Sequence, residues 1–139
     1  MDTNKCKVTI CGDSNVGKTC LKNRIAHGFF DENTNATIIS SNISKPITLT
    51  DGGEIDFDIT DTPGQEKFRS LNQLFYNTAD IVLILFDLTN KKSFYEVKDY
   101  WYNSVKDNAK KDQSIIIFNY LFSIGNCRNK MWSSGKIWS

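Results

Sequence analysis

The sequence has few of the features that mark membrane, secreted or nucleic-acid-binding proteins. Its longest uninterrupted apolar run, residues 81–86, is far shorter than the stretch of about 20 residues that crosses a bilayer as a helix. The formal net charge is only +1, which argues against a broad basic surface for nucleic acid or anionic lipid. The second residue is Asp2, not the glycine that N-terminal myristoylation requires. These absences predict a cytoplasmic protein.

Cysteine is scarce and shows no pairing pattern. No two of the four cysteines form a CxxC pair, and no signal peptide precedes them; they are Cys6, Cys11, Cys20 and Cys127. We interpret them as reduced thiols, not as disulfides or zinc ligands. The chain of 139 residues, without internal repeats, predicts one compact domain.

Strand-like and helix-like segments alternate along the chain, which predicts an α/β fold. Apolar runs indicate strands, and the strands expected are residues 7–11, 43–50, 55–59, 81–86 and 114–118. The second and third of these flank the turn 51–53 and are expected to form a hairpin. Since short turns join strands to helices, we expect a mostly parallel sheet with helices on both faces.

Apolar residues at helical spacing predict three helices, over residues 17–26, 67–77 and 93–109. Such spacing is typical of a stripe that packs against a core. The stripe of the second helix comprises Phe68, Leu71, Leu74 and Phe75, and that of the third comprises Phe94, Val97, Trp101 and Val105.

The segment between the first strand and the first helix fits the phosphate-binding pattern Gly-x-x-x-x-Gly-Lys-Ser/Thr. Its glycines allow the backbone to wrap closely around phosphate oxygens, and N–H groups at the head of the helix then point at the phosphates. Lys18 supplies a positive charge to the β- and γ-phosphates, and the Thr19 hydroxyl is a ligand for Mg²⁺. The alternative is a glycine-rich turn without a ligand. The expected nucleotide-binding residues here are Gly12, Asp13, Ser14, Asn15, Val16, Gly17, Lys18, Thr19 and Cys20.

A second motif, Asp-Thr-Pro-Gly-Gln, begins at Asp61 directly after a predicted strand. Asp61 would reach the Mg²⁺ through water, and Gly64 can offer its N–H to the γ-phosphate. Gln65 can orient the water that attacks the phosphate. Alone, the motif could be an acidic polar turn, but its distance from the first motif favours a shared nucleotide site.

The two motifs, their spacing and the segment 81–89 followed by Lys92, Ser93 and Phe94 resemble the small GTPases of the Ras superfamily, in particular the Rab group. The resemblance covers residues 5–118. It implies a three-layer P-loop NTPase (small G-protein) fold with a mostly parallel sheet. It also places a first switch at residues 29–38, where Thr37 would be a further Mg²⁺ ligand. Phe30 would pack against the guanine ring, or would be a plain core aromatic.

The resemblance implies Mg²⁺-dependent hydrolysis of GTP to GDP and phosphate, as a molecular switch in vesicle traffic or signalling. Gln65 and Lys18 would then be the catalytic residues, with Thr19, Thr37 and Asp61 around the metal. GTP or GDP, an exchange factor, a GTPase-activating protein and effector proteins are the partners that it implies, and no nucleic acid is among them.

After Phe118 the resemblance fails. A small GTPase continues directly into an Asn-Lys-x-Asp motif that reads guanine. Here Cys127 replaces the lysine and Asn129 the aspartate, and both lie at the wrong distance from the strand. The chain ends at Ser139 without a prenylation cysteine. We therefore expect a partial G domain over 1–118, with the C-terminal part of the fold missing after the fifth strand. Residues 119–139 would form a divergent tail without a lipid anchor, so that membrane association is not expected.

Other interpretations fit the same sequence. The chain could be a degenerate, non-catalytic G-domain module that competes for regulators or effectors. It could be a P-loop ATPase of another class, or a fragment that does not fold stably. If the phosphate and Mg²⁺ contacts survive without the guanine-reading motif, selectivity for guanine over adenine should be weak.

Overall fold

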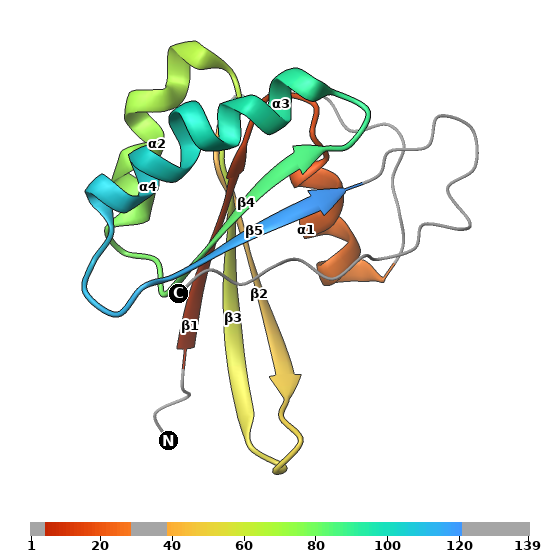
Figure 1. Cartoon of the computed structure of the whole chain (residues 1–139). Helices are drawn as coiled ribbons and strands as arrows, with labels where there is room; N and C mark the ends of the chain where they lie inside the picture. The colour runs from red at the N-terminus through yellow and green to blue at the C-terminus, as the bar shows by residue number, and fades with distance from the viewer. Residues whose placement is uncertain (1–4, 29–38, 121–139) are drawn as a thin grey trace.

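A computed structural model of the chain describes residues 5–28 and 39–120 (Figure 1). Within these residues the strands form one five-stranded sheet in the order β2-β3-β1-β4-β5. All neighbouring strands are parallel except β2 and β3, which form the predicted antiparallel hairpin. The strands are β1 (Lys5–Gly12), β2 (Ser41–Thr48), β3 (Glu54–Asp61), β4 (Ile81–Asp87) and β5 (Ser114–Tyr120). The predicted α/β architecture is confirmed.

Helices cover both faces of this sheet (Figure 1). Helix α1 (Lys18–His27) lies on one face, where it contacts β1, β2 and β3. On the other face lie the 3₁₀ turn η1 (Glu66–Phe68) and the helix α2 (Arg69–Tyr76), together with a helical stretch of three parts. These parts are α3 (Lys91–Glu96), the π-helical turn η2 (Val97–Trp101) and α4 (Tyr102–Asn108). No helix in the described part of the chain is long and apolar enough to cross a membrane.

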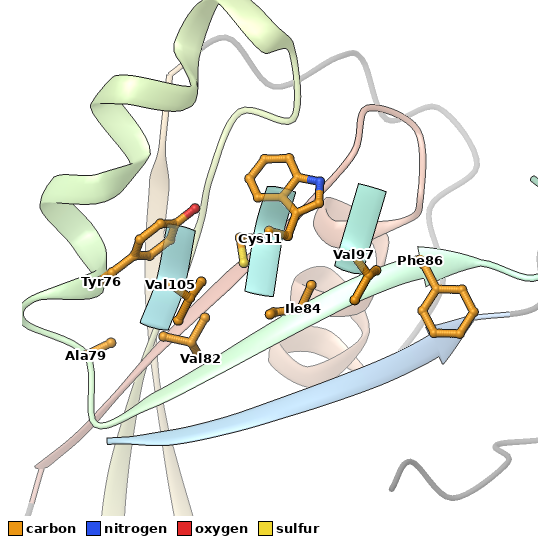
Figure 2. Packing of buried hydrophobic residues seen from close by; sticks show 9 residues of the cluster. Cys11, Tyr76, Ala79, Val82, Ile84, Phe86, Val97 and Val105 are labelled. Atoms are coloured by element: carbon orange, nitrogen blue, oxygen red, sulfur yellow. The ribbon is translucent and has the colours of Figure 1, made fainter. Parts of the chain in front are cut away.

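Strand β4 shows why both faces are covered, because its side chains alternate between two cores. Val82, Ile84 and Phe86 face α2, η2 and α4, whereas Leu85 faces α1. Figure 2 shows the first of these cores, in which Tyr76 packs over β4. Its buried members are Cys11, Tyr76, Ala79, Val82, Ile84, Phe86, Val97, Trp101 and Val105. The opposite core comprises Val8, Ile10, Val16, Leu21, Ile59 and Leu85.

Helix α2 corrects the expected orientation of its apolar stripe. Leu71 and Leu74 are 55% and 68% exposed, whereas Asn72 and Tyr76 are fully buried. The Asn72 side chain donates a hydrogen bond to the Pro63 carbonyl at 2.7 Å, which satisfies a buried backbone oxygen in the segment that leads into the helix. The helix is therefore turned so that a polar anchor and a tyrosine face the sheet, and the leucines face outward.

The predicted helix over 93–109 is interrupted by a π-helical turn. Val97, Trp101 and Val105 are buried as expected, but Phe94 is 53% exposed and packs edge-to-face against Phe86, with the ring centroids 5.2 Å apart. A π turn accommodates an additional residue in the helix, and such turns occur often at functional sites. The turn brings Tyr100 and Trp101 towards the carboxyl ends of β1 and β3, where the candidate site lies.

Candidate functional site

The loop between β1 and α1 has the backbone of an anion-binding concavity. Gly12, Asn15 and Gly17 have φ angles of 138°, 63° and 94°, which L side chains rarely adopt. A Cβ at Gly12 would overlap the carbonyl oxygen of Leu85, so that glycine is required by packing as well as by φ. Alternation of positive and negative φ turns neighbouring N–H groups towards one centre. The loop opens into α1, whose first turn contains no acidic residue to neutralise the positive end of the helix.

Lys18 lies inside this loop with only 5% of its surface exposed. Its ammonium donates a hydrogen bond to the carbonyl oxygen of Asp13 at 2.6 Å. Burial lowers the pKa of Lys18, and the nearby charge of Asp61 opposes that shift, as do Cys11 and Asp13. The site therefore holds a nearly buried cation that a polyphosphate could pair with.

The second motif packs directly against the loop. A Cβ on Gly64 would overlap Lys18 Nζ and would lie 2.6 Å from the carbonyl carbon and oxygen of Asp13. Thr62 donates to the Ile10 carbonyl through its hydroxyl at 2.8 Å and through its N–H at 3.3 Å. These contacts fix the segment after β3 against the end of β1, and they explain why only glycine fits at position 64.

Thr19 and Asp61 meet in the structure, although 42 residues separate them in the sequence. The Thr19 hydroxyl donates a hydrogen bond to Oδ2 of the fully buried Asp61. This pairing arises because β1 and β3 are neighbouring parallel strands, so that their carboxyl ends lie together. A hydroxyl and a carboxylate are hard oxygen donors of the kind that Mg²⁺ prefers, and the pair fits such an ion beside a phosphate.

The remaining predicted residues are placed as follows. Gln65 is partly exposed and begins the turn η1, with its carbonyl accepting from the Phe68 N–H at 3.0 Å. Val16 and Cys20 are buried, Val16 in the core beneath α1, whereas Ser14 and Asn15 face more towards solvent. Phe30 and Thr37 lie outside the described residues. The roles assigned to all these side chains stay predictions.

Sequence reasoning missed a network around the carboxylate of Asp13. The indole N–H of Trp101 donates to Asp13 Oδ1 at 3.0 Å, and the guanidinium of Arg69 approaches the same oxygen at 3.4 Å. Arg69 also pairs with Glu96 at 2.6 Å and lies 4.0 Å from the ring centroid of Tyr100. The network ties the loop between β1 and α1 to α2 and to the π turn. The helical spacing predicts Trp101 as a core residue, and its burial is confirmed, but the sequence holds no signal of its hydrogen bond.

Sequence reasoning also missed Lys22, which lies on α1 one turn after Thr19 and is 5% exposed. Its ammonium lies 3.9 Å from Asp61 Oδ2 and donates a hydrogen bond to the Ser41 hydroxyl. A buried lysine against the carboxylate of the candidate metal site was not expected from an ordinary-looking helix position.

The amino-acid sequence is similar to those of known proteins. The sequence model of the Ras family matches residues 7–126. The Ras-related protein RabH of Dictyostelium discoideum is 40% identical over 125 residues, which cover 90% of this chain and 62% of RabH. The Ras-related protein Rab-26 of Bos taurus is 35% identical over 111 residues, covering 80% and 43%. The Ras-related protein Rab-5B of Plasmodium falciparum is 35% identical over 113 residues, covering 81% and 54%. The chain thus spans between 43% and 62% of the length of these relatives.

Proposed function

The chain belongs to the Ras family, and from that premise we propose that it is a Rab-like switch that binds GTP and GDP with Mg²⁺ and hydrolyses GTP. One observation carries the proposal: the lysine of the first motif, the glycine of the second and the Thr19–Asp61 pair converge at one edge of the sheet. Two separate stretches of sequence, residues 12–20 and 61–65, supply at that edge a cation, a close backbone approach and a hard-oxygen pair.

In the proposed mechanism the chain mainly positions charges, as is general for phosphoryl transfer. The loop backbone holds the phosphates, and the ammonium of Lys18 pairs with the negative charge that spreads over them. Thr19 and Asp61 would hold Mg²⁺, which when bound neutralises the phosphate charge. Gln65 orients the attacking water, and Gly64 allows the segment after β3 to lie against the phosphates because it has no side chain.

Nucleotide binding can be tested by thermal unfolding in Mg²⁺ with GTP, GDP or ATP. A ligand that binds only the folded state at a concentration of 100 times its Kd adds about 2.7 kcal/mol of stability. For a chain of this size that corresponds to a rise in Tm of about 9 °C. We expect this rise with GTP and GDP, and its absence with every nucleotide would contradict the proposal. An equal rise with ATP would indicate binding without guanine selectivity.

Hydrolysis needs a separate test, because a non-catalytic binding module would give the same thermal shift. The variant Gln65→Ala should bind GTP as the wild type does and release phosphate at least about tenfold more slowly in single turnover. Glu66→Ala, a change at the exposed neighbouring position, serves as the control and should leave both properties unchanged. A wild type that binds GTP but releases no phosphate would identify the non-catalytic alternative. By family membership, an exchange factor, a GTPase-activating protein and effectors are the proposed partners.

A further inference from the structure

We propose that Lys22 sets the Mg²⁺ affinity of the nucleotide site by holding a positive charge against the carboxylate of Asp61. This inference rests on the proposed function, since it concerns the metal that accompanies the nucleotide. Lys22 is 5% exposed and Asp61 is fully buried, with 3.9 Å between Lys22 Nζ and Asp61 Oδ2. Buried charges are rare unless they are paired. The partner of Lys22 in this pair is Asp61, which together with Thr19 forms the candidate Mg²⁺ site.

Three elements of the fold hold the ammonium in this position. Lys22 follows Thr19 by three residues on α1, a spacing that places both side chains on the same side of the helix. In the β2–β3 hairpin Ser41 is the direct partner of Asp61, so their side chains lie close together at the end of the ladder. The ammonium of Lys22 reaches both, with a hydrogen bond to the Ser41 hydroxyl. Because α1, β2 and β3 all contribute, the charge is fixed near the carboxylate by the fold.

The electrostatic consequence has a definite sign. A carboxylate attracts Mg²⁺ through its negative charge, and a fixed cation at 3.9 Å offsets part of that charge and repels the divalent ion. In the absence of the metal, the same ammonium compensates the buried carboxylate. Lys22 therefore weakens Mg²⁺ binding and stabilises the metal-free protein. The lysine thus reduces the free-energy difference between the Mg²⁺-bound and the metal-free protein. Retention of nucleotide should therefore depend less on Mg²⁺ than it would without the lysine.

The test compares Lys22→Met with Lys45→Met. Lys45 also reaches α1 from β2, donating to the Ala26 carbonyl at 3.4 Å, so its loss removes the same charge from the same interface without touching Asp61. The protein is loaded with GDP, and the rate of GDP dissociation is measured across a range of free Mg²⁺ concentrations. Tm is measured in EDTA without nucleotide. In Lys22→Met we expect Mg²⁺ to slow GDP dissociation at a free concentration lower than in the wild type, by a factor of about ten or more. We also expect the Tm in EDTA to fall. Both quantities should stay at the wild-type values in Lys45→Met.

Opposite changes in the two measurements separate this role from a merely structural one, which would lower Tm without strengthening Mg²⁺ binding. Lys22→Gln is uncharged and can still hydrogen-bond to Ser41, and it should give the same result if the methionine variant does not fold. Lys22→Arg keeps the charge and should stay closer to the wild type than to the neutral variants. Unchanged or weaker Mg²⁺ binding in the neutral variants would overturn the inference. A wild type that binds no GDP at any Mg²⁺ concentration would instead overturn the proposed function.

Discussion

The hydrogen bond between Trp101 and Asp13 should make a measurable contribution to stability that can be isolated by a double-mutant cycle. The indole is fully buried, the Asp13 side chain is 15% exposed, and the donor–acceptor distance is 3.0 Å. A hydrogen bond to a charged group contributes about 1.5–3 kcal/mol. In Trp101→Phe the carboxylate of Asp13 would still have Arg69 at 3.4 Å from the same oxygen. We therefore expect a coupling energy between Trp101 and Asp13 near the lower end of this range, about 1.5 kcal/mol.

The cycle uses the wild type, Trp101→Phe, Asp13→Ala and the double variant, without nucleotide. Trp101→Phe also leaves a cavity that lowers stability. This loss is the same whether position 13 holds Asp or Ala, so it cancels in the cycle. Urea unfolding should be followed by far-UV circular dichroism, because the substitution removes a fluorophore. The double variant should be more stable than the sum of the two single losses implies, by the coupling energy. Losses that add to within about 0.5 kcal/mol would show that the contact contributes nothing and would refute the reasoning.

Three further predictions concern single sites. Gly12→Ala should lower the free energy of unfolding by at least about 2 kcal/mol in urea titrations, because its Cβ would overlap the Leu85 carbonyl at a φ of 138°; a loss below 0.5 kcal/mol, roughly the effect of an ordinary surface change, would contradict this. The pKa of Asp80 lies below its ordinary value of 3.8, chiefly because of a hydrogen bond from Lys110. The ionised carboxylate therefore stabilises the folded protein above the unfolded-state pKa, and this stabilisation is lost as the pH falls through the folded-state pKa. Asp80→Asn should therefore be less stable than the wild type at pH 7, by up to about 1 kcal/mol, and the two should converge in acid; a constant difference would contradict this. Burial raises the pKa of Cys11 to about 12, so that iodoacetamide at pH 8 should label this thiol only after unfolding, as peptide mass spectrometry can show.

Features that depend on local pattern could be predicted from the sequence. The hydrophobic runs gave the strands, and the glycines of the first motif mark positions where the backbone has φ angles that other residues avoid. The convergence of Thr19 and Asp61 also followed, because carboxyl ends of parallel strands lie at one edge of a sheet. These inferences need only the order of the elements and the chemistry of single residues.

Features that depend on contacts between distant segments could not be predicted. The stripe of Leu71 and Leu74 suggested the wrong face of α2, since spacing alone gives no account of the hydrogen bond by which Asn72 fixes the helix. Trp101 and Asp13 are 88 residues apart, and no local pattern pairs them. Lys22 looks like any helical lysine until the register of the hairpin places Ser41 and Asp61 beside it.

The central claim is that the loop after β1 binds a nucleotide polyphosphate through Lys18. It is tested most directly by titrating GDP calorimetrically, at saturating Mg²⁺, into the wild type and into Lys18→Ala, with folding of both checked by circular dichroism. We expect one GDP per wild-type chain and at least about a hundredfold weaker binding by the variant, because a nearly buried charged partner of the phosphates is lost. A folded wild type that takes up no GDP, or a variant that binds it equally well, would contradict the account.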